Sequence, residues 1–156
     1  MNSTAFGKKY TFYNSKVAIN FQAVVSKSQF NTINVEMANK LPSGQVDWKS
    51  SKLALQLSEI DAFKVFYCIA NSKPLRYESK FHGENKNKSI SFVEDGKGGC
   101  SIKLSDNGTV LFFDLSPGQW FYAKLLITEQ ILGLPISIDD AKKLMYIPEN
   151  TPQHKL

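Results

Sequence analysis

Apolar and polar side chains alternate through much of the first third of the chain. Between residues 9 and 26, apolar residues occupy every second position over 17–25, which is the period of a strand with one buried face. The pair Asn14–Ser15 interrupts this stretch and predicts a turn between two strands. A further alternating segment covers 32–38, and residues 41–44 are typical of a turn because they combine Pro, Ser and Gly. The pattern therefore predicts a series of strands with short connections.

The hydrophobic period changes at Ser58. Leucines alternate with other residues over 53–57, as in a strand, and a helical pattern begins immediately afterwards. The Ser58 hydroxyl can accept a hydrogen bond from a free amide of the first helical turn. We therefore expect a strand that runs directly into a helix, and the segment 71–74 ends that helix. The apolar residues at helical spacing are Ile60, Phe63, Phe66, Tyr67 and Ala70.

A second group of strands and a second helix follow. Alternating segments between Gly-containing loops predict strands over 75–82, 89–94, 100–105 and 109–115. Ser116 followed by Pro117 is typical of a helix start, and Gly133 is typical of a helix end. Ser137 is placed to cap a short last helix over 141–146.

Alternation divides the segment 75–82 into two faces. The face with more apolar residues carries Leu75, Tyr77, Ser79 and Phe81, of which we expect the two aromatic residues in the core. The opposite face carries Arg76, Glu78, Lys80 and His82. This second face is basic except for its glutamate, and we expect it to lie in solvent.

The order of elements is four strands, a helix, four strands and a helix. Strands that are grouped before a helix, and do not alternate with helices, indicate an α+β protein with antiparallel sheets. We expect one domain over residues 9–147, with loose tails over 1–8 and 148–156.

The composition permits a polyanionic partner. The 156 residues carry a net charge of +5, and such an excess of positive charge favours binding to nucleic acid without proving it. Cys68 and Cys100 lie far apart and outside any Cys/His cluster, so neither a disulfide framework nor a zinc site is indicated. No apolar run approaches membrane-spanning length and no signal region is visible, so we expect a cytoplasmic protein that does not contact a membrane.

The motifs of common enzyme classes are missing from the sequence. We find no P-loop, GxSxG, HExxH or dinucleotide-binding fingerprint. Glu36, Glu59 and Asp61 come from different faces of the predicted elements and indicate no carboxylate cluster. We expect no catalytic residues, no metal site and no cofactor, and therefore a binding protein.

Three segments carry a resemblance to a known family. These are Tyr13–Ala18, Asp47–Lys52 and Leu55–Ile60. In this order and spacing they resemble the Whirly single-stranded-DNA-binding proteins, within the wider fold group of the positive-cofactor-four transcriptional coactivator and the trypanosome mitochondrial guide-RNA-binding proteins. The first segment departs from the family motif, because Asn14 and Ser15 stand where the family has lysine and glycine.

The resemblance implies a fold, an assembly and a ligand. The fold is two antiparallel four-stranded sheets set against each other, with helices at their junction, and four chains join through those helices. Single-stranded DNA is expected to lie along the sheet edges, bound with little sequence preference, in replication, recombination, repair or conjugative transfer. A prokaryotic relative from a plasmid or phage is the expected context.

Lysines and aromatic residues are the candidate contacts, because ammonium groups neutralise phosphates and aromatic rings stack on bases. The candidate nucleic-acid-binding residues are Tyr13, Lys16, Asn20, Trp48, Lys49, Lys52, Arg76, Lys80, Lys86 and Lys88. For Trp48, packing against a neighbouring sheet is an equal alternative to stacking. Two further functions stay open: an RNA-binding or annealing factor on the same fold, and a regulator that binds a protein partner.

Overall fold

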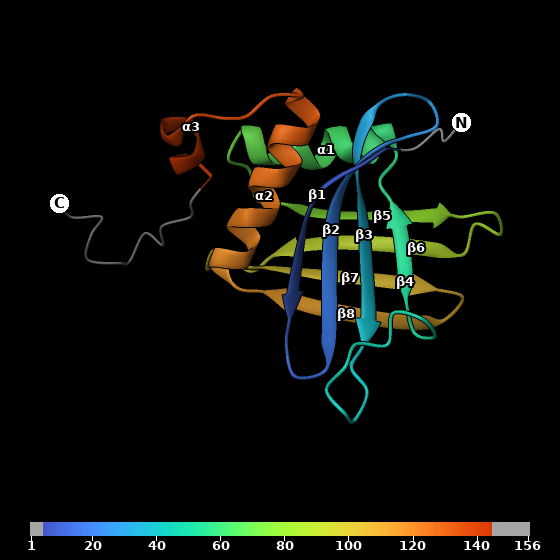
Figure 1. Cartoon of the computed structure of the whole chain (residues 1–156). Helices are drawn as coiled ribbons and strands as arrows, with labels where there is room; N and C mark the ends of the chain where they lie inside the picture. The colour runs from blue at the N-terminus through green and yellow to red at the C-terminus, as the bar shows by residue number, and fades with distance from the viewer. Residues whose placement is uncertain (1–4, 145–156) are drawn as a thin grey trace.

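Two four-stranded sheets and three helices make up the described part of the chain. The computed structural model describes residues 5–144 (Figure 1). The strands are β1 (Ala5–Tyr13), β2 (Val17–Val25), β3 (Asn31–Asn39), β4 (Leu53–Gln56), β5 (Arg76–His82), β6 (Lys88–Glu94), β7 (Cys100–Asp106) and β8 (Thr109–Leu115). The helices are α1 (Glu59–Ala70), α2 (Pro117–Leu132) and α3 (Ile138–Lys142). Each sheet is an antiparallel meander, in the orders β1-β2-β3-β4 and β5-β6-β7-β8, so the predicted α+β class is confirmed.

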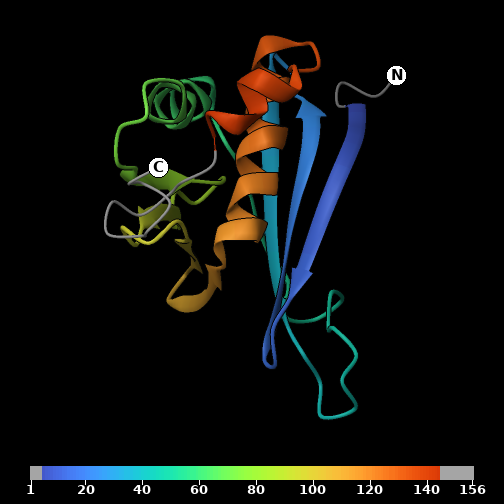
Figure 2. The ribbon, with the colours of Figure 1, turned by 90° about the vertical axis from the view of Figure 1, so that its left-hand side faces the viewer.

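The two sheets run across one another, and the core lies between them. Figure 1 shows the strands of the first sheet crossing in front of those of the second. The contacts join β2 and β3 to β8, and β4 to β6 and β7. Helix α2 lies along the inner side of the first sheet and also contacts α1 (Figure 2). The largest fully buried side chains include Phe21, Ile33, Phe92, Phe113 and Trp120, and burying each one contributes about 1.5–3 kcal/mol.

Local sequence signals determine the starts of the two long helices and the end of the second. Ser58 caps α1 by accepting a hydrogen bond from the Asp61 amide, and the Asp61 carboxylate accepts one from the Ser58 amide. Ser116 and Gln119 form the same reciprocal pair at the start of α2. Gly133 ends α2 with a φ of 75°, a conformation that costs glycine nothing because it lacks a Cβ.

Helix α1 exposes much of the apolar stripe that the sequence marks. Its buried hydrophobic residues are Ala62, Val65 and Ile69. Ile60, Phe63 and Tyr67 are exposed by 66%, 60% and 44%. The face of smaller side chains packs toward α2 and β3. The rings of Phe63 and Tyr67 contact each other, and the Lys73 amine lies 5.2 Å from the centre of the Tyr67 ring.

Two boundaries differ from the predicted ones. Strand β1 begins at Ala5 and not at Lys9, because pairing with β2 continues past an irregularity in register between Phe6 and Lys9. The predicted tail 1–8 is therefore partly strand, and residues 1–4 and 148–156 lie outside the described residues. Helix α3 begins directly after its cap, Ser137, three residues earlier than predicted, and residues 145 and 146 are not described.

The predicted faces of β5 are wrong at its end. The register between β5 and β6 shifts between Ser79 and His82, and Phe81 has a φ of 68°. This bulge reverses the alternation, so Phe81 is 74% exposed while His82 turns inward toward Asp61. Tyr77, which precedes the bulge, packs against the core as predicted.

Candidate nucleic-acid interface

Five of the predicted site residues meet at one end of the first sheet. In an antiparallel sheet the β1–β2 turn and the β3–β4 connection lie at the same end, which is the lower end in Figure 1. The Lys40 amide donates a hydrogen bond to the Lys16 carbonyl at 2.8 Å, and the Lys40 amine lies 5.8 Å from the centre of the Tyr13 ring. We call this group the sheet-end cluster, and its members are Tyr13, Lys16, Lys40, Trp48, Lys49 and Lys52.

A hydrogen-bonded turn holds the tryptophan of the sheet-end cluster. The Asp47 carboxylate accepts a hydrogen bond from the Ser50 amide at 3.0 Å. The Ser51 hydroxyl donates to the Asp47 carbonyl and accepts from the Asn39 amide, both at 2.9 Å. Trp48 and Lys49 therefore lie on a turn fixed to the end of β3. Aspartate and serine side chains that bond nearby backbone groups favour turns over strands.

An open hollow of about 590 Å³ adjoins this turn. Lys16 and Lys40 bring two ammonium groups to it, and the residues that line it include no acid. The other lining residues are Ser15, Asn39, Leu41, Pro42 and Gly44. The hollow can therefore receive a phosphate group without repulsion from a neighbouring carboxylate.

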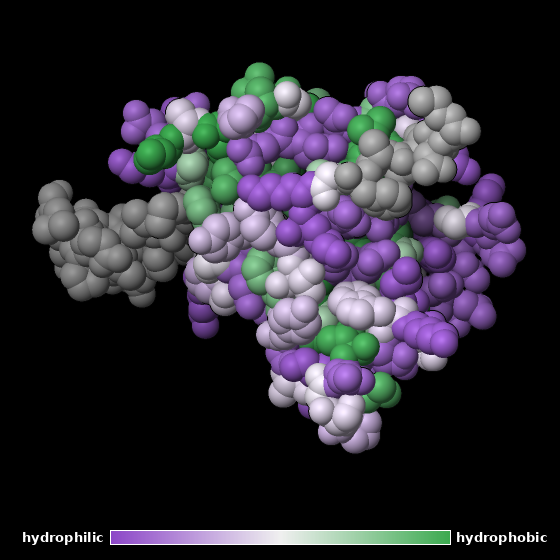
Figure 3. Space-filling model, viewed as in Figure 1, coloured by the Kyte–Doolittle hydropathy of each residue, from purple (hydrophilic) through white to green (hydrophobic). Residues whose placement is uncertain are grey.

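The β5–β6 hairpin of the second sheet forms a second basic group. We call it the hairpin cluster, and its members are Lys80, Phe81, Lys86 and Lys88. The Lys88 amine donates a hydrogen bond to the Ala54 carbonyl of β4 at 3.3 Å, so the hairpin reaches the edge strand of the first sheet. Lys52 directly precedes that strand and pairs with Glu36 at 3.4 Å. Figure 3 shows hydrophilic side chains over this side of the molecule.

Phe81 is a candidate contact that sequence reasoning missed. A bulky residue with positive φ is a genuine outlier, and such strain costs about 1–3 kcal/mol and tends to occur at functional sites. The strained backbone places an aromatic ring in solvent between Lys80 and the basic loop. Strand alternation alone gives no signal for it, because the bulge that exposes it inverts the pattern.

Two predicted site residues lie elsewhere. Asn20 is buried, with 6% of its surface exposed. Its amide donates to Glu36 at 3.3 Å and its carbonyl accepts from Thr11 at 3.2 Å. These bonds join three neighbouring strands, so Asn20 connects the sheet and is not a free contact. Arg76 begins β5, four residues before Lys80, and it lines a different cavity.

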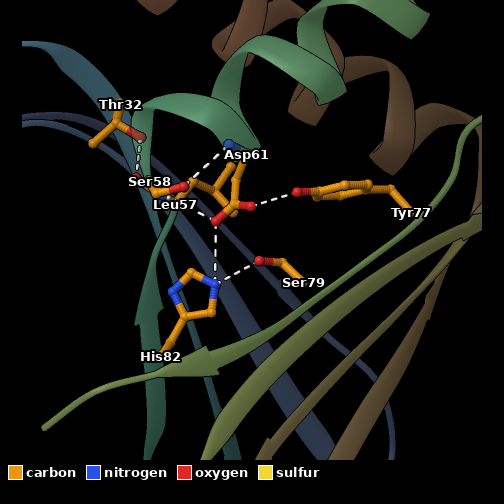
Figure 4. Close-up of polar contacts among 7 residues, drawn as sticks. All are labelled: Thr32, Leu57, Ser58, Asp61, Tyr77, Ser79 and His82. Atoms are coloured by element: carbon orange, nitrogen blue, oxygen red, sulfur yellow. Dashed lines mark hydrogen bonds and ion pairs between the residues drawn. The ribbon is translucent and has the colours of Figure 1, made fainter. Parts of the chain in front are cut away.

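Ser79, His82 and Asp61 lie together beneath α1 (Figure 4). The Ser79 hydroxyl is 2.6 Å from Nε2 of His82, and the Asp61 carboxylate is 3.2 Å from the same nitrogen. In a catalytic triad the acid orients the imidazole through its other nitrogen. This arrangement therefore lacks the geometry of a nucleophilic triad and instead connects the start of α1 to β5.

The ionisation of this group follows from its contacts. Burial alone raises the pKa of Asp61, but hydrogen bonds from Tyr77, Ser79 and Ser58 outweigh it and hold the pKa below the usual 3.8. The Tyr77 hydroxyl donates to Asp61 at 2.5 Å. Burial, together with this bond to a carboxylate, raises the pKa of Tyr77 to about 12. The pair is therefore a carboxylate and a neutral phenol at neutral pH.

Solved structures with the same arrangement include crystal structures of WHY1 and WHY3 from Arabidopsis thaliana. Both align with a TM-score of 0.54, at 12% and 14% identity, over 83% of this chain and 92% and 90% of theirs. The structure of the plant transcriptional regulator PBF-2 aligns with a TM-score of 0.54 at 13% identity, over 83% of this chain and 84% of that one.

The Whirly-type fold expected from the sequence is confirmed by these alignments. At such identities the likeness establishes the fold alone. No family model and no curated protein matches the sequence. Within residues 5–144, no helix combines the length and the apolar composition needed to cross a bilayer.

Proposed function

We propose that the protein binds single-stranded DNA with little sequence preference. The observation that carries this proposal is that both clusters adjoin β4, the edge strand of the first sheet. The sheet-end cluster contains Lys52, which precedes β4, and the hairpin cluster contains Lys88, which bonds to it. A strand that follows this edge meets ammonium groups and aromatic rings in turn.

The contacts have little capacity to read a base sequence. Ammonium groups bind phosphates, which are the same at every nucleotide, and aromatic rings stack on the face of any base. Phe81 and Tyr13 are exposed, and Trp48 is half-buried. A protein with this chemistry covers unpaired strands wherever they form, which suits replication, recombination, repair or conjugative transfer.

The proposal includes a homo-oligomer, with a tetramer favoured. Ile60, Phe63 and Tyr67 give α1 an apolar stripe that stays largely exposed in the described chain. Adjacent exposed apolar side chains of this kind are typical of surfaces at which proteins associate. A second copy that covers the stripe also brings its own basic clusters close to the first.

Fluorescence anisotropy with a labelled oligonucleotide tests the function. We expect binding to single-stranded DNA that weakens as salt rises, because phosphate neutralisation releases counterions, with a slope of about −0.7 in log–log form per phosphate contact. Duplex DNA of the same sequence should bind less tightly, because its bases are not free to stack. Binding that does not change with salt would contradict the proposal.

Competition with an RNA oligonucleotide of the same sequence distinguishes a DNA-binding protein from an RNA-binding one. Stacking and phosphate contacts are available in both polymers, so RNA should compete, but not more strongly than DNA. RNA that displaces DNA at a much lower concentration would show that the ligand is RNA.

A further inference from the structure

A cavity of about 350 Å³ lies at the opposite end of β5 from the hairpin cluster. Its lining residues come from the end of α1, the α1–β5 connection, the turn between β6 and β7, α2, and residues 143 and 144. Neither the sheet-end cluster nor the hairpin cluster contributes to its lining. Its volume falls within the range of small-molecule sites.

The lining combines an apolar surface with an excess of positive charge. Ile69, Pro74, Leu75 and Leu144 provide apolar contact area. The cationic side chains are Lys73, Arg76, Lys124 and Lys143, against the two carboxylates of Glu94 and Asp95. A ligand that fits both properties has a negatively charged group and an apolar body.

Hydrogen bonds within the protein already occupy both carboxylates. One oxygen of Glu94 accepts from the Leu75 amide at 2.7 Å and the other from the Trp120 indole at 2.8 Å. Asp95 accepts from the amides of Lys97 at 2.7 Å and Gly99 at 3.0 Å. These hydrogen bonds hold the walls of the cavity in place, and within residues 5–144 neither acid lies within ion-pair distance of a lysine or arginine.

Lys124 is the most informative of the four cations. Only 7% of its surface is exposed, and burial lowers the pKa of its amine. The amine donates to the Leu144 carbonyl and lies 5.8 Å from the centre of the Trp120 ring. No carboxylate of residues 5–144 lies within ion-pair distance of it. The charge of Glu94 favours the protonated amine, but burial outweighs it, and a bound anion would stabilise the buried ammonium further.

We propose that this cavity binds a small organic phosphate. The phosphate faces Lys124, and Lys73, Arg76 and Lys143 contribute further positive charge. The apolar body lies on Ile69 and Leu75. A phosphate suits this site better than a carboxylate, because it can carry two negative charges and several cations line the cavity. Of these, Lys143 also pairs with Asp140 at 3.5 Å, and the Lys73 amine lies 5.2 Å from the centre of the Tyr67 ring. The site does not depend on the DNA-binding proposal.

Phenyl phosphate is the probe, with phenol and benzoate as its uncharged and carboxylate counterparts. Isothermal titration calorimetry on the full chain should show phenyl phosphate binding with a Kd below about 1 mM, and weaker binding of benzoate and phenol. No phenyl phosphate binding up to about 10 mM, or equal binding of phenol, would overturn the proposal.

Lys124→Met separates binding from folding. This substitution keeps an unbranched chain and removes a buried charge, which favours folding, but it also removes the hydrogen bond to Leu144, so the melting temperature should change little. Phenyl phosphate affinity should fall at least about tenfold. Lys97→Met is the matched control, because Lys97 is exposed on the β6–β7 turn and outside the lining, and it should leave the affinity unchanged. Equal affinity in both variants would refute the site.

Oligonucleotides identify the source of the phosphate. If the natural ligand is the end of a strand, a 5′-phosphorylated oligonucleotide should bind better than its hydroxyl form, and Lys124→Met should abolish the difference. If the ligand is a free organic phosphate, both forms should bind equally and Lys124→Met should not change either. A loss of affinity for both forms in Lys124→Met would place the lysine in the general DNA interface and overturn the proposal.

Discussion

Lys88 of the second sheet donates a hydrogen bond to the Ala54 carbonyl of the first. The bond connects the β5–β6 hairpin to an edge strand, and it places an ammonium group beside the shortest strand of the fold. One side chain therefore contributes both to the relative position of the two sheets and to the charge that faces a bound polynucleotide.

Lys88→Met should weaken DNA binding and slightly weaken the fold. Loss of one hydrogen bond to the backbone costs about 0.5–1.5 kcal/mol of unfolding free energy. Loss of one phosphate contact should reduce the salt slope by about 0.7. Urea unfolding and anisotropy at several salt concentrations measure the two effects. Lys97→Met, at the far end of β6, should change neither, and an unaltered slope in Lys88→Met would remove Lys88 from the interface.

Trp48→Ala should weaken binding more than it weakens folding. The indole is half-buried on a turn, and stacking on one base contributes about 1–3 kcal/mol. Trp120 provides the comparison, because it is fully buried and its replacement by alanine should cost about 3–5 kcal/mol of stability. Thermal unfolding and oligonucleotide titration separate the two roles. If Trp48→Ala unfolds as readily as Trp120→Ala, the indole is a packing residue.

Phe81→Gly should weaken DNA binding without loss of stability. Glycine adopts positive φ freely, so the substitution removes the strain at 68° while it adds flexibility to the unfolded chain. The two effects partly offset one another, and the unfolding free energy should change by less than about 1 kcal/mol. Phe112→Gly is a matched comparison, since Phe112 is also exposed but lies on β8, and it should leave DNA affinity unchanged. Full DNA affinity in Phe81→Gly would show that the exposed ring is not a contact.

The strands, their order and the helix ends could be predicted from the sequence because they depend on local chemistry. Ser58, Ser116 and Gly133 act on their own backbone neighbourhood, and the alternation over 17–25 needs only one covered face. Phe81 and His82 could not be placed, because a bulge reverses the period on which the prediction depends.

Which site residues lie close together could not be predicted from local sequence patterns. Lys16 and Trp48 lie at the same end of the first sheet because both connections end there, which follows once the strand order is known. The sequence does not show that Asn20 is buried, because its polar side chain hydrogen-bonds to Thr11 and Glu36 on the neighbouring strands. Lys124 lies on a helix whose spacing predicts burial of its neighbours, but its contact with Leu144 depends on where the chain returns after α2.

Stability should fall at both extremes of pH through Asp61 and Tyr77. The pKa of Asp61 is lower in the folded chain than its usual 3.8, so the unfolded chain takes up the proton first and stability decreases as pH falls below about 3.8. The pKa of Tyr77 is raised from 10.0 to about 12, so the unfolded chain loses its proton first and stability decreases as pH rises from about 10 to 12.

Urea unfolding across pH, on the wild type and two variants, tests this linkage. Asp61→Asn should flatten the acid side of the stability profile, and Tyr77→Phe should flatten the alkaline side. Tyr77→Phe should also lower stability at neutral pH by about 1–2 kcal/mol, because the buried Asp61 carboxylate loses a donor. An alkaline profile that Tyr77→Phe leaves unchanged would show that another group controls it.

Phe63→Glu should dissociate the proposed oligomer while the chain stays folded. The ring is 60% exposed on α1 beside Tyr67, so a charge there costs little in the single chain but is unfavourable in an apolar contact between copies. Analytical ultracentrifugation should show a smaller species for this variant, with an unchanged circular dichroism spectrum. Phe112→Glu is the control, because Phe112 is 63% exposed on a different element, and it should keep the assembly.

The dissociated variant also reveals how assembly contributes to binding. Separate copies lose the gain in effective concentration that comes from linking several sites. Long oligonucleotides should therefore bind Phe63→Glu about 10²-fold or more weakly, while an oligonucleotide that fills one site keeps its affinity. If the wild type sediments as a single chain, or if both lengths of oligonucleotide lose affinity equally, the stripe on α1 does not join copies of this protein.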